Sequence, residues 1–208
     1  MCRMLESMDF IMMTTNNSRP RGRPRRFDPD QAVATAQHLF HAHGYDAVSV
    51  ADVTDALGIN PPSFYAAFGS KAGLYARVLD RYAGTGAIPL GDLLLPDRPV
   101  AGCLASVLEE AARRYATDPD ATGCLVLEGT RCNDREAREA ACVFHAAAED
   151  MIRRYIAARY PEEAERLTDF VSTVMAGLSA RARNGYGLDR LLASARLAGL
   201  ALAQALPA

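Results

Sequence analysis

Apolar residues near the start of the chain recur at steps of three and four residues, which predicts a first amphipathic helix from about Asp28 to His43. Asp28 is a favoured N-cap residue, Pro29 occupies the favoured first helical position, and Gly44 follows as a stop. The apolar face of this helix consists of Ala32, Val33, Ala36, Leu39 and Phe40. The pattern therefore predicts a helix with one side buried against other elements.

Two shorter helices are predicted next. Ser49 and Asp52 fit a capping box, which opens a second helix. This helix ends at a four-residue break with the sequence LGIN, and Asn60 at the end of the break caps a third helix that starts at Pro61. Two short helices across such a break, preceded by a longer support helix, have the dimensions of a helix-turn-helix.

A fourth helix is predicted from a cap at Ser70 to about Tyr82, and the Gly- and Pro-rich segment 84–99 after it predicts a linker. Helical periodicity then returns five times, at residues 99–117, 123–132, 134–159, 161–184 and 188–206. No strand pattern competes with these helices, so the predicted fold class is all-α. We expect three parts: a disordered N-terminus at residues 1–26, a helix-turn-helix domain at 27–83 and a larger helical domain at 84–208.

The last two predicted helices carry broad apolar faces. The face of the first consists of Leu167, Phe170, Val171, Val174, Met175 and Leu178. The face of the second consists of Leu191, Leu192, Ala195, Ala198, Gly199 and Leu202. Together they offer more apolar surface than one core wall needs, and a four-helix contact between two copies would cover it. We therefore expect a homodimer through these helices.

Composition is that of a globular protein, and it leaves charge as the informative property. Half of the 208 residues are hydrophobic and 23% are charged, and no apolar run reaches the roughly 18 residues of a membrane span, so no membrane partner is expected. The five cysteines, an odd number without a CxxC pair, indicate reduced thiols and a cytoplasmic location. The net charge of -2 hides a cluster of positive charge near the N-terminus.

This positive cluster lies at residues 19–26 and contains the sequence PRGRP. The pattern is that of an AT-hook, in which the glycine lets the backbone lie on the floor of a narrow A·T minor groove while arginines fill the groove. The arginines expected to contact DNA are Arg21, Arg23, Arg25 and Arg26. Two alternatives stay open: a basic tail that binds any polyanion, and an architectural protein that binds AT-rich DNA mainly through this arm.

The third predicted helix is the candidate recognition helix, which would enter the major groove of DNA. Its first turn offers Pro61, Pro62 and Ser63 to the base edges. Only Ser63 has a side chain that forms hydrogen bonds, so we expect few polar base contacts, with the prolines touching thymine methyl groups. Tyr65 is better suited to a phosphate oxygen.

Lys71 stands in the first turn of the fourth helix, where a cation opposes the helix macrodipole by roughly 0.3–1 kcal/mol. A bound phosphate would reverse the sign of that interaction. We therefore expect Lys71, the free amides of this helix end and the Ser49 hydroxyl to hold a DNA phosphate. The alternative is a solvated lysine on a loop.

At these spacings the N-terminal residues resemble the DNA-binding domain of the TetR/AcrR family of bacterial transcription regulators. The matching residues, within about Phe27–Tyr82, are Phe40, Gly44, Tyr45, Ser49, Val50, Val53, Leu57, Gly58, Ile59, Ser63, Phe64, Tyr65, Phe68, Ser70 and Lys71. The resemblance implies a dimeric regulator, most often a repressor, which a small effector bound in the C-terminal domain releases from operator DNA. By the same resemblance the operator contacts are Ser49, Ser63, Tyr65 and Lys71. Pro61-Pro62 and Ala72-Gly73 depart from the family pattern at the starts of the third and fourth helices.

The C-terminal domain resembles the family only in its helical layout, so its effector site is argued from the residues. The aromatic and polar candidates are Tyr115, Cys124, Phe144, His145, Tyr155, Phe170 and Asn184. With Thr122 as N-cap, Cys124 would fall in the first turn of a helix, where the dipole lowers a thiol pKa. An alternative function is therefore a regulator of the same family that senses oxidants or electrophiles through Cys124. The simpler interpretation of Cys124 is a small buried hydrophobe.

Other chemistry finds little support in the sequence. His38 and His41 lie about one helical turn apart, but no cysteine or carboxylate stands at a matching step, so we expect no metal site. No P-loop, nucleotide-binding fingerprint or nucleophile elbow appears, so we expect neither a cofactor nor an enzyme. The sequence thus predicts a ligand-responsive regulator whose partner is double-stranded operator DNA.

Overall fold

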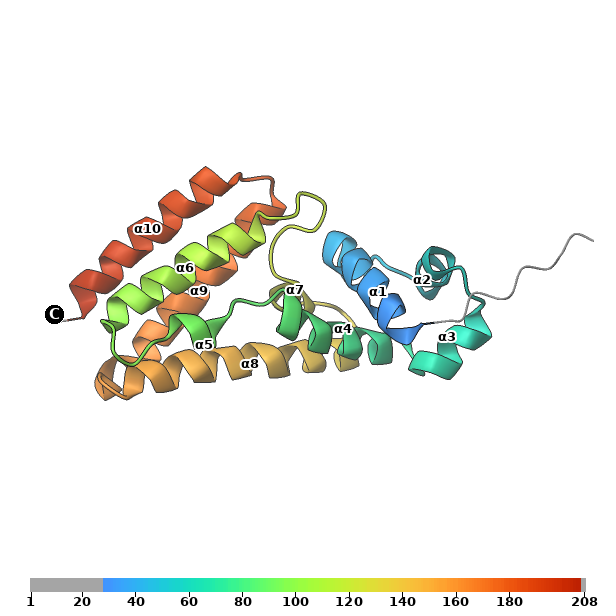
Figure 1. The fold of residues 1–208 in the computed structure, drawn as a ribbon, viewed down its shortest axis with the longest axis horizontal. Coiled ribbons are helices and arrows are strands. Elements are labelled where there is room, and N and C mark those ends of the chain that lie inside the picture. Colours follow the sequence, from blue (N-terminus) through green and yellow to red (C-terminus); the bar gives the residue numbers. More distant parts are fainter. Residues whose placement is uncertain (1–27, 207–208) are drawn as a thin grey trace, which may run out of the picture.

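The computed structural model describes residues 28–206, and every regular element in that range is helical (Figure 1). The helices are α1 (Pro29–His43), α2 (Val50–Leu57), α3 (Pro61–Phe68), α4 (Lys71–Thr85), α5 (Leu90–Leu93), α6 (Val100–Tyr115), α7 (Leu125–Gly129), α8 (Arg135–Ala157), α9 (Ala164–Arg183) and α10 (Leu188–Ala205), with a 3-10 turn η1 (Pro161–Glu163) before α9. The all-α prediction is confirmed. The predicted arginine arm lies outside the described residues.

The first four helices begin where the sequence predicts, because a side chain caps each of them. The capping residues, which accept hydrogen bonds from amides of the first turn, are Asp28, Ser49, Asn60 and Ser70. The predicted capping box at Ser49 is complete. Gly58 ends α2 with a φ of 63°, a left-handed conformation that favours glycine. Helices α2 and α3 are therefore fixed on either side of the predicted break.

The segment after α4 is more structured than its Gly and Pro content predicts. Helix α4 continues to Thr85, and α5 lies inside the predicted linker. Leu90 and Leu94 are buried against the C-terminal core, so packing stabilises this short helix, which has no capping side chain. The helix predicted at residues 123–132 is only Leu125–Gly129.

A core of aromatic and aliphatic side chains holds α1–α4 together. Phe40 and Phe64 are fully buried, and the edge of the buried Tyr75 ring packs on Phe40 with 5.2 Å between ring centroids. Leu125 of α7 and Ala141 of α8 belong to the same core. Helices α7 and α8 thus pack directly on the helix-turn-helix part, so the N-terminal core extends across the predicted division at residue 83.

The second core lies among α6, α8, α9 and α10. It is built around fully buried side chains such as Leu108, Ile152, Val171 and Leu191. In Figure 1, α6, α9 and α10 lie side by side at one end of the molecule, and α8 runs from there toward α4. The long helix α8 therefore contributes to both cores.

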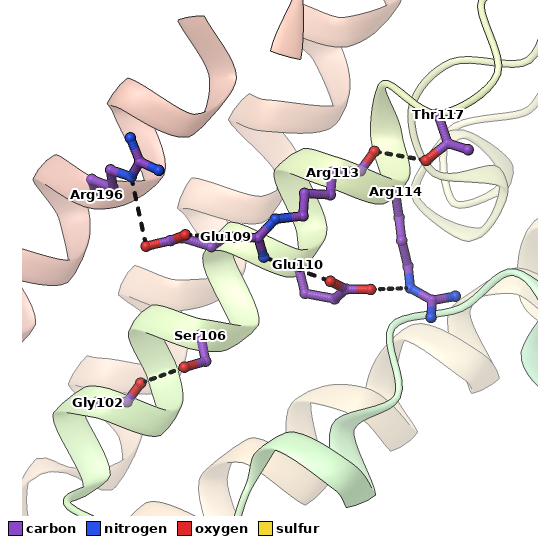
Figure 2. A network of polar contacts seen from close by, with 8 residues as sticks. All are labelled: Gly102, Ser106, Glu109, Glu110, Arg113, Arg114, Thr117 and Arg196. Carbon is purple, nitrogen blue, oxygen red and sulfur yellow. Dashed lines mark hydrogen bonds and ion pairs between the residues drawn. The ribbon is translucent and has the colours of Figure 1, made fainter. Parts of the chain in front are cut away.

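Ion pairs run along α6, and one of them joins it to α10 (Figure 2). Arg114 Nε lies 2.8 Å from Glu110 Oε1, and Arg114 Nη1 donates to Gly86 O at 3.5 Å, which joins α6 to the segment after α4. Glu109 lies 3.8 Å from Arg196 of α10. These groups are partly exposed, so each pair contributes at most about 1 kcal/mol. Buried apolar side chains, rather than ion pairs, therefore hold this bundle together.

Helix α10 packs part of its predicted contact face against other helices of the same chain. The residues of that face that are buried are Leu191, Ala195, Ala198 and Leu202. The large apolar side chains that α10 leaves exposed are Leu188, Leu197 and Leu200. The expectation that the first set is surplus surface was wrong, because α10 packs along α6. Among the described residues, no helix is long and apolar enough to cross a membrane.

Candidate nucleic-acid interface and internal cavity

Helix α3 presents its predicted contact residues to solvent. The exposed residues are Pro61, Pro62, Ser63 and Tyr65, the last at 51%. Phe64 and Phe68 are buried beneath them and anchor the helix. Figure 1 places α2 and α3 at one end of the molecule and α10 at the other. The accessibility that a recognition helix needs is therefore present.

Glycines at the junction of α3 and α4 let the two helices meet closely. Gly69 has a φ of 73°, so it turns the chain at little cost. A Cβ atom on Gly73 would lie 2.3 Å from the Phe68 carbonyl oxygen, a distance that no side chain tolerates. The departure from the family pattern at Ala72-Gly73 therefore has a local cause, since a larger residue at position 73 would push α4 away from the end of α3.

Lys71 makes contacts within the protein. Its Nζ donates to Tyr45 O at 2.8 Å and to Val48 O at 2.7 Å, and it lies 4.0 Å from the centroid of the Tyr45 ring. These carbonyl dipoles and the ring face stabilise the cation, so they supply the compensation that we had assigned to a phosphate. The macrodipole alone therefore does not require a phosphate at Lys71. A contact between Lys71 and DNA remains a prediction that rests on the family resemblance.

Ser49 is exposed but engaged in the cap of α2. Its hydroxyl donates to Asp52 Oδ2 at 2.7 Å and accepts from Asp52 N at 3.1 Å. The Ser49 amide also donates to Asp52 Oδ2, and these hydrogen bonds lower the pKa of the Asp52 carboxyl. A phosphate contact by Ser49 would have to compete with this capping box. It therefore remains a prediction, as do the contacts of the arginine arm.

A cavity of about 390 Å³, partly open to solvent, lies between α4, α6, α7, α8, α9 and the α5 segment. Of the predicted effector residues, those that line it are Tyr115, Cys124, Phe144 and His145. Tyr155 and Phe170 do not line this cavity, because they pack on the C-terminal core. Asn184, the C-cap residue of α9, does not line it either. The sequence analysis missed Tyr82, Glu149, Ser172 and Met175, which also line the cavity. Tyr82 was missed because it lies before the predicted domain boundary, in the part of the chain where no effector residue was expected.

Cys124 lies at the wall of this cavity in an apolar environment. Tyr82 Oη donates to Cys124 Sγ at 3.8 Å, and the Cys124 amide donates to Ser179 Oγ at 2.9 Å. Burial raises the pKa of the Cys124 thiol, although we expected a lowered value. Helix α7 begins after Cys124, which itself occupies the N-cap position predicted for Thr122. A five-residue helix does not offset the loss of hydration around the thiol.

A carboxylate stands at another part of the cavity wall. Glu149 Oε1 accepts a hydrogen bond from Ser172 Oγ at 2.5 Å, and Glu149 Oε2 lies 3.7 Å from His145 Nδ1. No lysine or arginine among the described residues lines the cavity. The cavity is therefore mostly apolar, with hydroxyl, thiol and carboxylate groups at a few points and no fixed positive charge.

Arg183, at the end of α9, joins the bundle to the C-terminal end of α1. Its Nη1 donates to His41 O at 3.0 Å and to Thr122 O at 3.1 Å, and its Nε lies 3.4 Å from Glu128 Oε2 of α7. A Cβ atom on Gly123 would lie 3.0 Å from Arg183 Cγ, so glycine permits this close approach. We call these five residues the interdomain network. It links three helices that the sequence assigns to two different domains.

The His41 ring takes part in the same network. With Nε2–H as donor, His41 binds Gly123 O at 3.1 Å. The ring also packs edge-on against Tyr82, with 5.5 Å between ring centroids. Burial lowers the pKa of His41, so the neutral ring is favoured. Since Tyr82 lines the cavity and His41 belongs to α1, the two side chains place the cavity wall in contact with the helix-turn-helix part.

A second link joins the loop after α1 to the start of α8. Tyr45 Oη donates to Asp134 Oδ2 at 3.0 Å. The Asp46 carboxylate accepts hydrogen bonds from the amide and the side chain of Asn133, the shortest at 3.0 Å. The loop between α1 and α2 is therefore held by residues of the segment that joins α7 to α8.

This arrangement, an exposed recognition helix within a four-helix domain that is joined to a helical bundle, is that of a helix-turn-helix DNA-binding regulator. Residues 32–78 match the family model described as bacterial regulatory proteins, tetR family. The chain is 58% identical over 191 residues to the HTH-type transcriptional repressor BdcR of Escherichia coli (strain K12), with 92% of this chain and 97% of BdcR covered. It belongs to the TetR family and is a DNA-binding transcriptional regulator.

Two further relatives support the assignment. The HTH-type transcriptional repressor ComR of Escherichia coli (strain K12) is 30% identical over 183 residues, which cover 83% of this chain and 87% of ComR. A cysteine mutant of the TetR family transcriptional regulator CifR, complexed with 26bp double-strand operator DNA, matches with a TM-score of 0.77 and 33% identity. That match covers 86% of this chain and 99% of the CifR chain.

Proposed function

We propose that this protein is a cytoplasmic homodimeric repressor, which binds a pseudo-palindromic operator through α3 and releases it when a small molecule fills the cavity. The observation that carries this proposal is the pairing of an exposed α3 with a cavity whose wall includes Tyr82 of the supporting helix α4. The similarity to BdcR and ComR, both named as repressors, supports the sign of regulation. The operator complex of CifR supports double-stranded DNA as the ligand of α3.

The exposed face of α3 favours shape and methyl recognition over polar base contacts. Ser63 is the side chain in its first turn that can hydrogen-bond a base, and Pro61 and Pro62 offer apolar surface to thymine methyl groups. Tyr65, half of whose surface is exposed, donates to a phosphate. We expect the arginine arm, Arg21, Arg23, Arg25 and Arg26, to add affinity for A·T-rich flanks.

The exposed apolar residues of the last two helices support a homodimer. Leu188, Leu197 and Leu200 of α10 are exposed, and Phe170 and Val174 of α9 are only partly buried. A monomer gains nothing from exposing such side chains, whereas an isologous contact between two copies would bury both sets. The dimer would hold two α3 helices at a fixed separation, as an operator with two half-sites requires.

Release would follow from the contacts that the cavity wall makes with the DNA-binding end. A molecule beside Tyr82 displaces α4, and the interdomain network transmits the shift to α1 through His41. Helix α3 is packed on α4, so it moves with α4. Such coupling is reciprocal and typically amounts to about 1–3 kcal/mol, so the effector binds more weakly when operator is present.

The test is operator binding by the purified protein on DNA from upstream of its own gene. We expect protection of a two-fold site in footprinting and a preference over random duplex at moderate salt. Ser63→Ala relaxes the preference at one base pair of each half-site, whereas Tyr65→Phe weakens binding to every duplex alike. Glu162→Gln, an exposed change in η1, is the matched control. Equal affinity for operator and random duplex contradicts the proposal.

Thiol sensing by Cys124 is a second candidate function. The observation in its favour is that the sulfur lines the cavity within 3.8 Å of the Tyr82 hydroxyl. Its raised pKa keeps the sulfur protonated, so reaction with peroxide or an electrophile should be slow at neutral pH and faster at higher pH. If such treatment affects operator binding equally in wild type and Cys124→Ser, this candidate is excluded.

Binding that depends mainly on the arginine arm is the remaining alternative. A protein that lacks residues 1–26 should keep its half-site preference with lower affinity if α3 selects the operator. Loss of all binding in that protein would favour an architectural role instead.

A further inference from the structure

The hydroxyl group of Tyr115 is a buried donor whose candidate acceptor among the described residues is the Cys124 sulfur, a weak acceptor. Tyr115 is 1% exposed, and its Oη has no hydrogen-bond partner of normal geometry in the described part of the chain. Buried hydroxyl groups in proteins are nearly always hydrogen-bonded, so an orphan of this kind calls for a partner from outside the chain. Tyr115 lines the cavity, which is where such a partner can lie.

The Cys124 sulfur approaches this hydroxyl without a hydrogen bond of normal geometry, so an oxygen of a ligand would be a better acceptor. Tyr82 Oη already donates to Cys124 Sγ at 3.8 Å. Burial raises the pKa of Tyr115 well above its usual range, so the group remains a protonated donor at neutral pH. Burial also keeps the Cys124 thiol neutral, so its sulfur offers this hydroxyl a weak acceptor and no negative charge.

The remainder of the wall argues against an anionic ligand. No described lysine or arginine lines the cavity, and the carboxylate of Glu149 lies there. One oxygen of Glu149 accepts a hydrogen bond from Ser172 at 2.5 Å and the other lies 3.7 Å from His145 Nδ1, so groups of the protein already contact both oxygens. The other lining groups are mostly apolar, among them Phe144 and Met175. The cavity volume of about 390 Å³ is at the small end of the range for ligand pockets.

We infer that the effector is a small, uncharged and largely apolar molecule with one hydrogen-bond acceptor, which accepts from Tyr115 Oη. This inference rests on the proposed function only in taking the cavity as the effector site. The apolar body of the ligand packs against Phe144 and Met175, and water leaves the cavity when it binds. Carboxylates, phosphates and nucleotides are excluded from this class, because burying their charge here would have no compensation.

Four probes of nearly equal size test this class: acetophenone, which carries a carbonyl acceptor, ethylbenzene, which lacks it, benzoate as the anion and 1-phenylethylammonium as the cation. Their dissociation constants are measured by ligand-observed NMR titration with the full chain and its Tyr115→Phe variant. We expect Tyr115→Phe to weaken acetophenone about 2- to 10-fold, the usual range for one hydrogen bond. The affinity for ethylbenzene should stay within about twofold.

Tyr155→Phe is the matched control, because Tyr155 Oη donates to Leu95 O at 2.9 Å outside the cavity. It should leave the affinities of all four probes unchanged. The inference is overturned if Tyr115→Phe leaves acetophenone binding unchanged, or if neither neutral probe binds at millimolar concentration. It is also overturned if benzoate or 1-phenylethylammonium binds wild type more tightly than acetophenone does.

Operator affinity measured at saturating acetophenone separates this inference from the proposed function. If Tyr115→Phe weakens the binding of acetophenone but not of ethylbenzene, the ligand class is supported, whether or not operator affinity changes. If operator affinity does not change when the cavity is full, release by cavity occupancy is contradicted while the ligand class stands. If operator affinity falls but Tyr115→Phe has no effect on acetophenone binding, release by cavity occupancy stands while the ligand class is contradicted.

Discussion

The two ends of the molecule are stabilised in different ways. Each of α1–α4 starts with a side-chain cap, and each such cap contributes about 1 kcal/mol. Among the described helices after α4, α8 alone has a capping side chain, from Asp134. The DNA-binding end is therefore fixed largely by local interactions, whereas the C-terminal helices depend on packing against one another.

The two ends also differ in how completely they are filled. Aromatic rings of Phe40, Tyr45 and Tyr75 contact one another in the N-terminal core at centroid distances of 4.8 to 5.6 Å. The C-terminal part instead keeps a cavity of about 390 Å³, where the Tyr115 hydroxyl makes no hydrogen bond of normal geometry with the described residues. A part that must hold α3 in one orientation is closely packed, and a part that must admit a ligand is not.

The largest expected effect compares one phenylalanine from each end. Phe64→Ala removes a fully buried ring from the filled core and should lower the free energy of unfolding by about 3–5 kcal/mol. Phe144→Ala removes a half-buried ring from the cavity wall and should cost roughly 1–2 kcal/mol. Urea unfolding followed by circular dichroism measures both. Equal losses would show that the cavity wall is as tightly packed as the core.

A smaller effect is expected from two glycines of α4. Gly73→Ala forces a Cβ atom to within 2.3 Å of Phe68 O and should destabilise the protein by about 1–3 kcal/mol. Gly84→Ala is the matched control, because its Cβ atom would meet nothing within 4 Å and alanine favours the helix by up to about 1 kcal/mol. Thermal melts should therefore shift in opposite directions, and a shift in the same direction contradicts the close contact between α3 and α4.

The pH dependence of stability should report on the contact between the two ends. The lowered pKa of His41 means that the unfolded chain binds more protons near pH 6.5, so stability rises with pH there. The contribution of neutral His41 is complete above about pH 6.5 and is lost as the pH falls through the lowered pKa. His41→Asn should flatten this slope in urea titrations, whereas the same change at the exposed His43 should not. Parallel slopes in all three proteins would argue against a buried His41.

The smallest effect concerns the orphan hydroxyl. Tyr115→Phe in the empty protein removes a donor whose contact with the Cys124 sulfur falls short of normal hydrogen-bond geometry, so the melting temperature should stay the same or rise slightly. Tyr155→Phe, which deletes the hydrogen bond to Leu95 O, should cost about 1 kcal/mol. Differential scanning calorimetry distinguishes the two variants, and a matching loss at Tyr115 would reveal a partner within the chain.

The contrast between local and tertiary stabilisation explains what the sequence could predict. The starts of α1–α4 were predicted because Asp28, Ser49, Asn60 and Ser70 cap amides two or three residues away. Helix α5 was missed because it has no such residue and is stabilised by burial of Leu90. The prediction that Thr122 caps a helix with Cys124 in its first turn was wrong for the same reason, since no side chain caps α7.

The same contrast separates the site residues that the sequence could predict from those that it could not. The exposed positions on α3 follow from helical periodicity, so Ser63 and Tyr65 could be predicted from the sequence. The partners of Lys71 could not, because Tyr45 O and Val48 O lie 26 and 23 residues away along the chain. The cavity brings together residues from Tyr82 to Met175, and no pattern in the sequence marks them as neighbours.

Helix α4 is a wall of the cavity through Tyr82 and also the support on which α3 rests. A substitution at Tyr82 that retunes ligand choice would therefore alter DNA affinity at the same time. Positions on α8 and α9, such as Ala148 and Ser172, face the cavity without forming part of that support. Lineages that acquire a new inducer while keeping their target promoters are thus expected to diverge at those positions and to retain the aromatic ring on α4.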